Sequence, residues 1–448
     1  MKTESYNGAL LSTLIITSIM VLAMPFLSPA PAHAALTPHD PIYIEGNENF
    51  TPANGIVAGS GTENDPYIIE NWDISAENDN GIEMRNTTAH FVIRNCRIHD
   101  GLNGISFNTA INGIVENNTC ENNIDGIYLY FSGNNILRNN ICNNNDYCGI
   151  QLVDSSGNNA LRKNTFSNNY YGIFLDSSGN STIDNNTCSG NINGIYVDYS
   201  DNNLISNNIC ISNDYCGIYF DESGNSTIVN NICSINGDTG IALDSPDNNT
   251  LRNNICNNND YCGIYLFSEE SLGSAILENN TCNGNYDGIY VDYSENNLIS
   301  NNIVGNNVLG IYFEYRADNN TISGNIVENN YHGIRFFDSD NNLIYHNNFA
   351  NNTNQAYDNC SNYWDNGYPS GGNYWSDYTG SDTNGDEIGD TPYNIPGDNS
   401  QDRYPFVIGS ISPAPPEELN WPLTVGVSVL SLIGIAIVLY LLIYIRRH

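Results

Sequence analysis

The chain has 448 residues, with 50 Asp and Glu against 13 Lys and Arg, and a formal net charge of −37 at pH 7. Phosphate binding needs clustered Lys and Arg, so this balance argues against nucleic acid as a partner. The length is ample for one long repeat array with covered ends, and the acidic surface suits solubility, cation binding or a high-salt setting.

Residues 1–34 are typical of a secretory signal peptide. Lys2 precedes an apolar stretch from Leu10 to Leu27, and Ala32-His33-Ala34 has the small-x-small pattern of a cleavage site. An uncleaved anchor is the alternative interpretation. In both cases the following chain is expected to lie outside the cytoplasm, where disulfides are permitted.

Residues 35–80 are expected to form an N-terminal cap. Ile42–Ile44 and Tyr67–Ile69 have the composition of strands, and Gly59–Thr62 is a cluster of turn residues. An open end of a strand stack exposes backbone donors and acceptors, so a repeat array needs such a cover.

Residues 81–350 contain an internal repeat. The pair Gly-Ile recurs at steps of 22, 23 or 25 residues, beginning at Gly81, Gly104, Gly126, Gly149, Gly172, Gly194, Gly217, Gly240, Gly263, Gly288, Gly310 and Gly333. Self-similarity at a nearly fixed period near 22 indicates a stacked repeat array.

Each repeat has the pattern of three short strands. In the repeat that begins at Gly194, apolar and polar residues alternate from Ile195 to Asp198, which is typical of a half-buried strand. Two further apolar runs are bounded by Asn pairs, and Asn suits tight corners because it tolerates left-handed backbone. The sequence therefore predicts an all-β parallel β-helix of about 12 coils of 22–23 residues, with a length on the order of 55 Å.

Cysteines occupy the third apolar run of seven coils, where other coils have Ile, Val or Phe, so most of them are expected to be small core residues. Three coils carry a second Cys at the sixth position, and the sequence predicts three disulfides inside enlarged corners. The pairs are Cys142–Cys148, Cys210–Cys216 and Cys256–Cys262. Zinc is the alternative, although no His accompanies these pairs.

The outward positions of the first strand carry rings and carboxylates. The third residue of this strand, counted from the Gly, is aromatic at Tyr128, Phe174, Tyr196, Tyr219, Tyr265, Tyr290 and Tyr312. The fifth is acidic at Asp176, Asp198, Asp221, Asp244, Asp292 and Glu314. Sugar-binding surfaces use rings for apolar sugar faces and carboxylates for hydroxyls. Tyrosine also suits strands and stacks on itself, so a purely structural role stays open.

A polysaccharide hydrolase or lyase would need a specialised carboxylate pair. Neighbouring coils offer carboxylates at similar spacing everywhere, so spacing alone selects none. The coil with the 25-residue step breaks the repeat at Glu269 and Glu270, which are the only catalytic candidates.

Residues 351–409 are expected to form a C-terminal cap with a calcium-like loop. Oxygen ligands would come from Asp382, Asn384, Asp386, the carbonyl of Ile388, and Asp390. Glu387 replaces the Gly of a calcium loop at position 6, and Tyr393 replaces the Glu at position 12. A solvated acidic turn is the alternative, and any calcium bound here would be structural.

The C-terminal segments are typical of a membrane anchor. Residues 410–420 form a Pro-rich spacer, residues 421–445 are apolar and long enough to cross a bilayer, and residues 446–448 are basic. A basic end stays cytoplasmic. The sequence therefore predicts a single-pass protein of the cell membrane with its ectodomain outside, unless the helix is a removable sorting signal.

Three motifs carry a family resemblance. These are Gly59–Thr62 with Asp65–Glu70, the Asn-Asn/Gly-Ile coil, and Gly371–Asp377 with Ile388–Tyr393 and Asp402–Pro405. With them the chain resembles the NosD-like parallel β-helix proteins, which are grouped with carbohydrate-binding proteins and sugar hydrolases, and looks like surface proteins of methanogenic archaea. The resemblance implies a right-handed, single-stranded parallel β-helix.

Copper maturation, the role linked to NosD, is poorly supplied with ligands in this chain. The histidines of the ectodomain are His39, His90, His99, His332 and His346, and Met84 is its only Met. Copper sites need clustered His, Met or thiols, so no copper is expected.

The favoured interpretation is a membrane-anchored surface protein that acts by binding or adhesion in the cell envelope. Its partners would be envelope glycans or surface proteins. A passive surface-layer component and a polysaccharide hydrolase or lyase are the alternatives.

Overall fold

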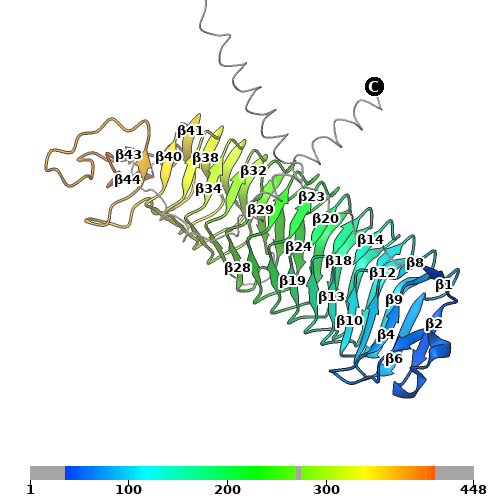
Figure 1. The fold of residues 1–448 in the computed structure, drawn as a ribbon. Coiled ribbons are helices and arrows are strands. Elements are labelled where there is room, and N and C mark those ends of the chain that lie inside the picture. Colours follow the sequence, from blue (N-terminus) through cyan, green and yellow to red (C-terminus); the bar gives the residue numbers. More distant parts are fainter. Residues whose placement is uncertain (1–35, 269–273, 399, 409–448) are drawn as a thin grey trace, which may run out of the picture.

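A computed structural model describes residues 36–268, 274–398 and 400–408. These residues form a long rod in which strands of successive coils lie side by side along the axis (Figure 1). Successive coils pair in parallel throughout, which confirms the predicted all-β parallel β-helix. Within the described part, no helix is long and apolar enough to cross a membrane.

Several predicted segments lie outside the described residues. These are the signal peptide at 1–34, Glu269 and Glu270, the spacer at 410–420, the membrane helix at 421–445 and the tail at 446–448. Each of them stays a prediction.

Three sheets form the wall of the rod. Sheet I consists of β2 (Ile42–Glu45), β6 (Ile82–Thr87), β9 (Asn103–Ala110), β12 (Asp125–Tyr130), β15 (Cys148–Val153), β18 (Tyr171–Asp176), β21 (Asn193–Asp198), β24 (Ile218–Asp221), β27 (Ile241–Asp244), β29 (Cys262–Phe267), β32 (Asp287–Asp292), β35 (Leu309–Glu314), β38 (His332–Phe337) and β41 (Asn354–Asp358). Sheet II consists of β3 (Ile56–Ala58), β4 (Tyr67–Glu70), β7 (Phe91–Arg94), β10 (Gly113–Glu116), β13 (Ile136–Arg138), β16 (Ala160–Arg162), β19 (Thr182–Asp184), β22 (Leu204–Ser206), β25 (Thr227–Val229), β28 (Asn249–Arg252), β30 (Ala275–Glu278), β33 (Leu298–Ser300), β36 (Thr321–Ser323) and β39 (Leu343–Tyr345).

Sheet III is divided into two parts. The first consists of β1 (Thr37–Pro38), β5 (Trp72–Ser75), β8 (Arg97–His99), β11 (Thr119–Glu121), β14 (Ile141–Asn143), β17 (Thr165–Ser167), β20 (Thr187–Ser189), β23 (Ile209–Ile211) and β26 (Ile232–Ser234). The second consists of β31 (Thr281–Asn283), β34 (Ile303–Gly305), β37 (Ile326–Glu328), β40 (Asn348–Ala350) and β42 (Tyr374–Trp375). Single bridges from Ile255 to Ile232 and to Thr281 connect the two parts.

Each predicted Gly-Ile pair opens one strand of sheet I, from β6 to β38. A side chain at this glycine has no room. At Gly126, an added Cβ would lie 2.5 Å from the carbonyl oxygen of Gly149 and 2.9 Å from the Cβ of Cys142. The Ile that follows is fully buried, and it stacks on the same Ile of the next coil, as in Ile195 and Ile218. The core is therefore a narrow column of like residues on like.

Two columns of buried asparagines run along the corners that flank sheet III. One contains Asn118, Asn140, Asn164, Asn186, Asn208, Asn231, Asn254, Asn280, Asn302, Asn325, Asn347 and Asn373, and the other Asn123, Asn145, Asn169, Asn191, Asn213, Asn236, Asn259, Asn285, Asn307, Asn330 and Asn352. The Nδ2 of Asn208, for example, donates to the Oδ1 of Asn231 at 3.0 Å and to the carbonyl of Ile183 at 2.9 Å. These amide ladders satisfy the backbone at corners where the strand pairing is interrupted.

The two residues of each Asn pair have different roles at a corner. The first Asn has the left-handed backbone expected from the sequence, with φ of 55° at Asn139 and 56° at Asn207. The second, Asn140 or Asn208, points inward and joins the ladder. The first Asn of the pair therefore turns the chain, and the second forms hydrogen bonds that hold the turn against the next coil.

The prediction of three disulfides is wrong, because all six cysteines are free thiols. Cys142 belongs to the apolar core, whereas Cys148 is buried outside it. The backbone N–H of Cys148 donates to Asp125 of the preceding coil at 3.0 Å, and Asn145 of the amide ladder lies between the two cysteines in the corner. The pairs Cys210–Cys216 and Cys256–Cys262 are separated in the same way.

Aromatic residues cover both ends of the apolar column. At the N-terminal end, η1 (Asn47–Asn49) and η2 (Pro52–Asn54) flank Phe50, whose ring stacks on Tyr67 at 4.4 Å. At the C-terminal end, Trp375 stacks on Phe349 at 4.6 Å and on Tyr393 at 4.3 Å, beside the hairpin of β43 (Tyr393–Asn394) and β44 (Gln401–Asp402). These residues serve as the caps that an open strand stack requires.

Buried carboxyl groups lie at three places along the rod. Burial raises the pKa of Asp287 to about 7, with a further contribution from Glu314. Burial also raises the pKa of Asp402 to about 7 and that of Asp125 to about 6. Each group holds its proton more tightly in the folded chain than in the unfolded chain, where an Asp has a pKa near 4.

The amide ladder predicts unequal effects for two adjacent residues. Replacing Asn140 by Ala leaves the carbonyl of Val115 and the N–H of Asn118 without partners, so the free energy of unfolding should fall by about 2–4 kcal/mol. Replacing the exposed, left-handed Asn139 by Gly should change it by less than about 1 kcal/mol. Urea unfolding of both variants checks this, and equal losses would contradict it.

The buried carboxyls predict that stability falls as the pH rises. Between about pH 4 and 7 the folded chain retains protons that the unfolded chain has released, so the free energy of unfolding should decrease by about 1–3 kcal/mol over that interval. Asp287→Asn should reduce this decrease, since the group no longer titrates. Asp214→Asn makes the same Asp-to-Asn substitution at an exposed position and is the matched control. Denaturant titrations at pH 5 and 7.5 measure the difference, and a rise in stability over this interval would refute the explanation.

Candidate functional site

The outward side of sheet I brings the predicted ring and acid residues into two neighbouring columns. Pairing in register places Phe174, Tyr196 and Tyr219 above one another, and likewise Tyr265, Tyr290 and Tyr312. We call these residues, with Tyr128, the aromatic column. The acidic column lies two residues further along each strand and contains Asp176, Asp198, Asp221, Asp244, Asp292 and Glu314. Together they form the aromatic–acidic face.

The rings of the aromatic column stack face to face. Centroids are 5.1 Å apart with an interplanar angle of 18° for Tyr196 on Tyr219, and 5.1 Å apart with 14° for Tyr290 on Tyr312. This spacing is close to the distance between neighbouring strands, so the coil repeat sets the stack. Within the stack, each ring covers the faces of its neighbours.

The aromatic column is interrupted by neutral residues at two coils and by a cation at a third. Gln151 stands between Tyr128 and Phe174, and Ala242 stands between Tyr219 and Tyr265. Arg335 stands between Tyr312 and Tyr357. The ring column thus has three interior positions without a ring, and the last of them carries a cation.

Tyrosine hydroxyls bind carboxylates of the following coil. Tyr196 donates to Asp221 at 3.0 Å, and Tyr290 donates to Glu314 at 2.7 Å. Burial, followed by the charges of Asp221 and Asp176, raises the pKa of Asp198 to about 6. Hydrogen bonds therefore connect the two columns, and Asp198 is the carboxylate of this network that gains a proton at mildly acidic pH.

A second row of tyrosines borders this face, and the sequence analysis missed it. The row consists of the residues two positions before the Gly, Tyr147, Tyr170, Tyr215, Tyr261, Tyr286 and Tyr331, most of them well exposed. The ring of Tyr147 meets the edge of Phe174 at 6.3 Å. The recurring Asp-Tyr-Cys-Gly segment could have predicted this row, because a tyrosine precedes the cysteine each time that it occurs.

A pocket of about 240 Å³ lies where the face meets the C-terminal cap. Its lining includes His332 and Tyr357 from β38 and β41, and Asp377 and Tyr393 from the cap. The guanidinium of Arg335 lies over the ring of Tyr357, with 5.6 Å between its carbon and the ring centroid. We call this arrangement the end pocket.

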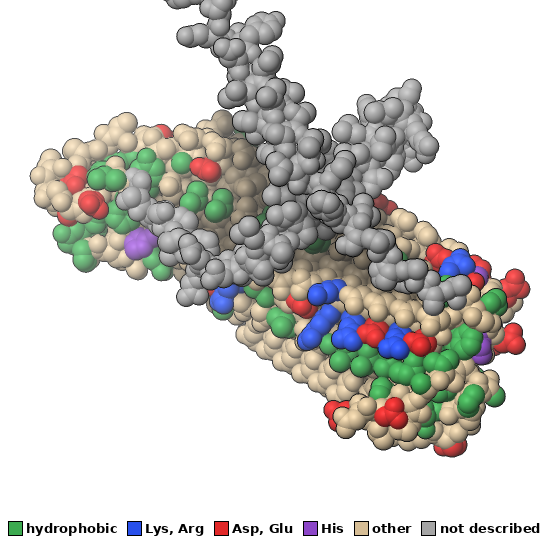
Figure 2. Space-filling view, viewed as in Figure 1, with side chains coloured by type: hydrophobic (Ala, Val, Ile, Leu, Met, Phe, Trp, Pro, Cys, Tyr) green, Lys and Arg blue, Asp and Glu red, His purple; other side chains and the backbone are tan. Residues whose placement is uncertain are grey.

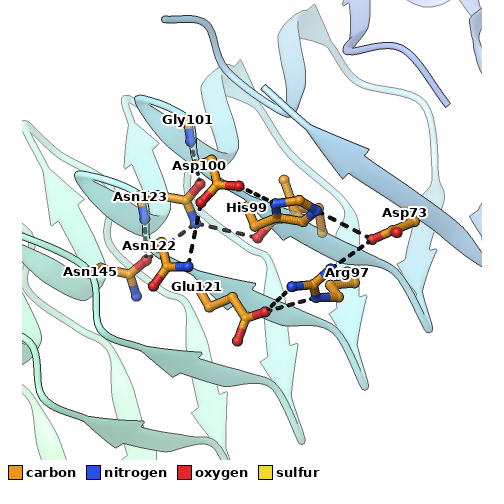
Figure 3. Close-up of polar contacts among 10 residues, drawn as sticks. Asp73, Arg97, His99, Asp100, Gly101, Glu121, Asn122, Asn123 and Asn145 are labelled. Carbon is orange, nitrogen blue, oxygen red and sulfur yellow. Dashed lines mark hydrogen bonds and ion pairs between the residues drawn. The ribbon is translucent and has the colours of Figure 1, made fainter. Parts of the chain in front are cut away.

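A separate charged cluster lies on sheet III at the N-terminal end (Figure 3). His99 contacts Asp100 at 2.6 Å and Asp73 at 3.4 Å, and Arg97 pairs with Glu121 at 2.6 Å. A cleft of about 640 Å³ is lined in part by Asp73 and His99. Both ring nitrogens of His99 are occupied by these carboxylates, so the cluster braces the first coils.

Sheet II carries a row of opposite charges on the N-terminal half of the rod, visible near β10 and β13 (Figure 2). Its ion pairs join neighbouring coils, with distances of 2.6 Å for both Arg94–Glu70 and Arg138–Glu116. These half-exposed pairs align coils and contribute little stability each.

The predicted calcium ligands lie in a loop of the C-terminal cap, Asp382, Asn384, Asp386, Ile388 and Asp390. The carboxylate of Asp382 accepts the N–H groups of Gly385 at 2.7 Å and Glu387 at 2.8 Å. Turn hydrogen bonds thus use oxygens that a calcium ion would need. Calcium binding by this loop stays a prediction.

His39 and His99 line the same cleft and core cysteines stack from coil to coil, but no metal site is completed around them in the described part of the chain. Met84 is fully buried in the core, and His332 and His99 lie near opposite ends of the rod. In residues 36–268, 274–398 and 400–408, no three His, Cys, Asp or Glu side chains are placed to hold a metal. These side chains do not fit a copper site.

Solved structures with a similar fold include alginate and mannuronan epimerases and an alginate lyase. The periplasmic alginate epimerase AlgG shares 15% identity over 73% of this chain and 84% of its own, with a TM-score of 0.44. The Azotobacter vinelandii mannuronan C-5 epimerase AlgE6 A-module shares 15% identity over 65% of this chain and 87% of its own, with a TM-score of 0.45. The PL6 family alginate lyase AlyGC shares 13% identity over 72% of this chain and 53% of its own, with a TM-score of 0.48. No curated protein sequence matches the chain.

One family model matches the chain three times, at residues 41–232, 152–274 and 210–380. Its description is "Periplasmic copper-binding protein (NosD)". The matches overlap and extend from the first coil into the C-terminal cap, over more than half of the sequence. They confirm the resemblance found in the Gly-Ile coil, and the chain belongs to the NosD family.

Proposed function

We propose that this protein is a cell-surface protein that binds carbohydrate on its aromatic–acidic face. The predicted signal peptide, Pro-rich spacer and membrane helix support a place in the cell envelope, with the rod outside. Its partners would be envelope glycans. The side chains of the described part do not fit a copper site, so no copper chemistry enters the proposal.

The interruption of the ring column at Ala242 carries this proposal. A sugar packs its apolar side on the face of an aromatic ring. Inside the stack those faces are covered at 5.0–5.1 Å by the next ring. On the side that points toward Ala242, neither Tyr219 nor Tyr265 has a ring of the column to stack on. These are the two ring faces that no other ring of the column covers at this interruption, where Ala242 itself is buried.

The two interruptions differ in their charged neighbours. In the coil of Ala242, the acidic column supplies Asp244, and Asp221 lies in the preceding coil. In the coil of Gln151, the corresponding position is Val153. Carboxylates accept strong hydrogen bonds from sugar hydroxyls, so the interruption at Ala242 is the better carbohydrate site.

A polysaccharide hydrolase or lyase remains the second candidate, favoured by one carboxyl group. The Oδ1 of Asp198 is buried and has no hydrogen-bond partner among the described atoms. Its pKa, raised to about 6 by burial and by Asp221 and Asp176, suits a general acid near neutral pH. Release of reducing or unsaturated chain ends would reveal such an activity.

Filling the interruption should abolish carbohydrate binding. Ala242→Tyr would complete the stack, stabilise the fold by about 0.5–1.5 kcal/mol and cover the facing sides of the Tyr219 and Tyr265 rings. Tyr219→Ala should weaken binding about tenfold, since losing a ring contact costs about 1.4 kcal/mol. Retention of the purified protein on a panel of insoluble polysaccharides, followed by calorimetry with the retained one, measures both effects.

Gln151→Tyr is the matched control, because it fills the other interruption of the same column. It should leave carbohydrate affinity unchanged while adding a comparable ring stack. If Ala242→Tyr binds as tightly as the unaltered protein, the proposed site is wrong. If the unaltered protein is retained by no polysaccharide, the passive surface-layer role becomes the better account.

A further inference from the structure

The aromatic–acidic face changes its chemistry at its C-terminal end. The earlier interruptions of the ring column are the neutral Gln151 and Ala242, whereas the last is Arg335, which lies between Tyr312 and Tyr357. The acidic column ends there, because Phe337 follows Glu314 in the same register. The face therefore carries a cation near its end, in a chain that has 50 acidic and 13 basic side chains.

Arg335 has no ion-pair partner among the described residues. Its guanidinium carbon lies 5.8 Å from the ring centroid of Tyr312 and 5.6 Å from that of Tyr357, so two tyrosines hold it in place. Its Nε is buried and makes no hydrogen bond to a described atom. By contrast, Arg85 on the same sheet pairs with Glu83 and lies over Tyr43. A buried cationic donor without an acceptor is costly, which points to an acceptor from outside the chain.

The end pocket beside Arg335 offers further polar groups. The Nδ1 of His332 is buried without a hydrogen-bond partner among the described atoms. Burial and the charge of Arg335 lower the pKa of His332, so the imidazole is neutral near pH 7. The hydroxyl of Tyr393 donates to both carboxylate oxygens of Asp377 at 3.2 Å. The pocket thus offers one neutral imidazole, one carboxylate and two rings, and the cation Arg335 lies beside it, over the ring of Tyr357.

The volume and the charges of the pocket select the ligand. About 240 Å³ is suited to a single sugar residue rather than to a longer segment. A guanidinium matches the planar, two-oxygen geometry of a carboxylate. Asp377 can accept sugar hydroxyls, and its charge disfavours a doubly charged group such as phosphate. The ring of Tyr357 supplies an apolar surface beside the cation.

We infer that the end pocket binds one acidic sugar residue, with the sugar carboxylate on Arg335. The inference rests on the proposed carbohydrate-binding function and adds that the glycan carries a uronic acid at this end of the face. The acidic column would repel a chain with a charge on every residue. A single carboxylate at Arg335 avoids that repulsion.

The test uses free glucuronate, with glucose as the uncharged counterpart, and the full chain. Ligand-observed NMR titration should show saturable binding of glucuronate and at least tenfold weaker binding of glucose. Arg335→Gln should weaken glucuronate binding at least tenfold and abolish the preference. Arg85→Gln is the matched control, because it removes an arginine that already has a carboxylate partner, and glucuronate binding should be unchanged. Circular dichroism and melting curves establish that both variants fold.

Ala242→Tyr separates this inference from the proposed function. It fills the interruption of the column but leaves the end pocket intact, so it should retain glucuronate binding while losing polysaccharide. If glucuronate binds no tighter than glucose, or if Arg335→Gln binds it as well as the unaltered protein, the end pocket is not an acidic-sugar site. Loss of polysaccharide binding in Ala242→Tyr would still support the aromatic–acidic face in that case.

Discussion

The hydrogen bonds between stacked asparagine amides are the constraint on which the rest of the structure depends. A coil of 22 or 23 residues must turn three corners, and each corner interrupts the strand pairing that satisfies its backbone. Asn140 resolves this by donating to Val115 of the preceding coil and Asn164 of the next, while its own oxygen accepts from Asn118. Because each amide is bonded on both sides, the coils cannot slip relative to one another.

The arrangement of the outward-facing side chains follows from this fixed register of the coils. With the register fixed, one residue type repeated at one coil position becomes a column, as for Tyr196, Tyr219 and their hydrogen-bonded acids. A regular column covers its own ring faces, so the distinctive places are those where the repeat fails. Ala242 and Arg335 are such places, and neither resembles a catalytic motif in the sequence.

The sequence was sufficient to predict what repeats. The Gly-Ile pairs, the alternation after them and the Asn pairs led to the parallel β-helix, its sheet I strands and its left-handed corners. They did not lead to the correct cysteine chemistry. Spacing placed Cys142 and Cys148 close together, but the wall of the rod separates a core thiol from an outer one.

The end pocket could not be predicted for a related reason. His332 and Tyr357 come from the last coils, whereas Asp377 and Tyr393 come from a cap whose path has no period. The buried carboxyl of Asp287 was missed because one residue decides its burial, and neighbouring coils have Cys262 and Leu309 at the same position. A repeating sequence pattern predicts the features that recur in every coil. Contacts that a residue makes only once in the rod are visible only in the three-dimensional structure.

The fixed register also gives the rod the property of a ruler. Ala242 and Arg335 lie in the same column, separated by the coils of Tyr265, Tyr290 and Tyr312, so their spacing is four strand steps, about 19 Å at roughly 4.8 Å per step. Duplication or loss of one whole coil between them would change that spacing by a single step while leaving every corner and column intact. Repeat number could therefore adjust the length of the ligand that spans the two places, independently of the residues that contact it.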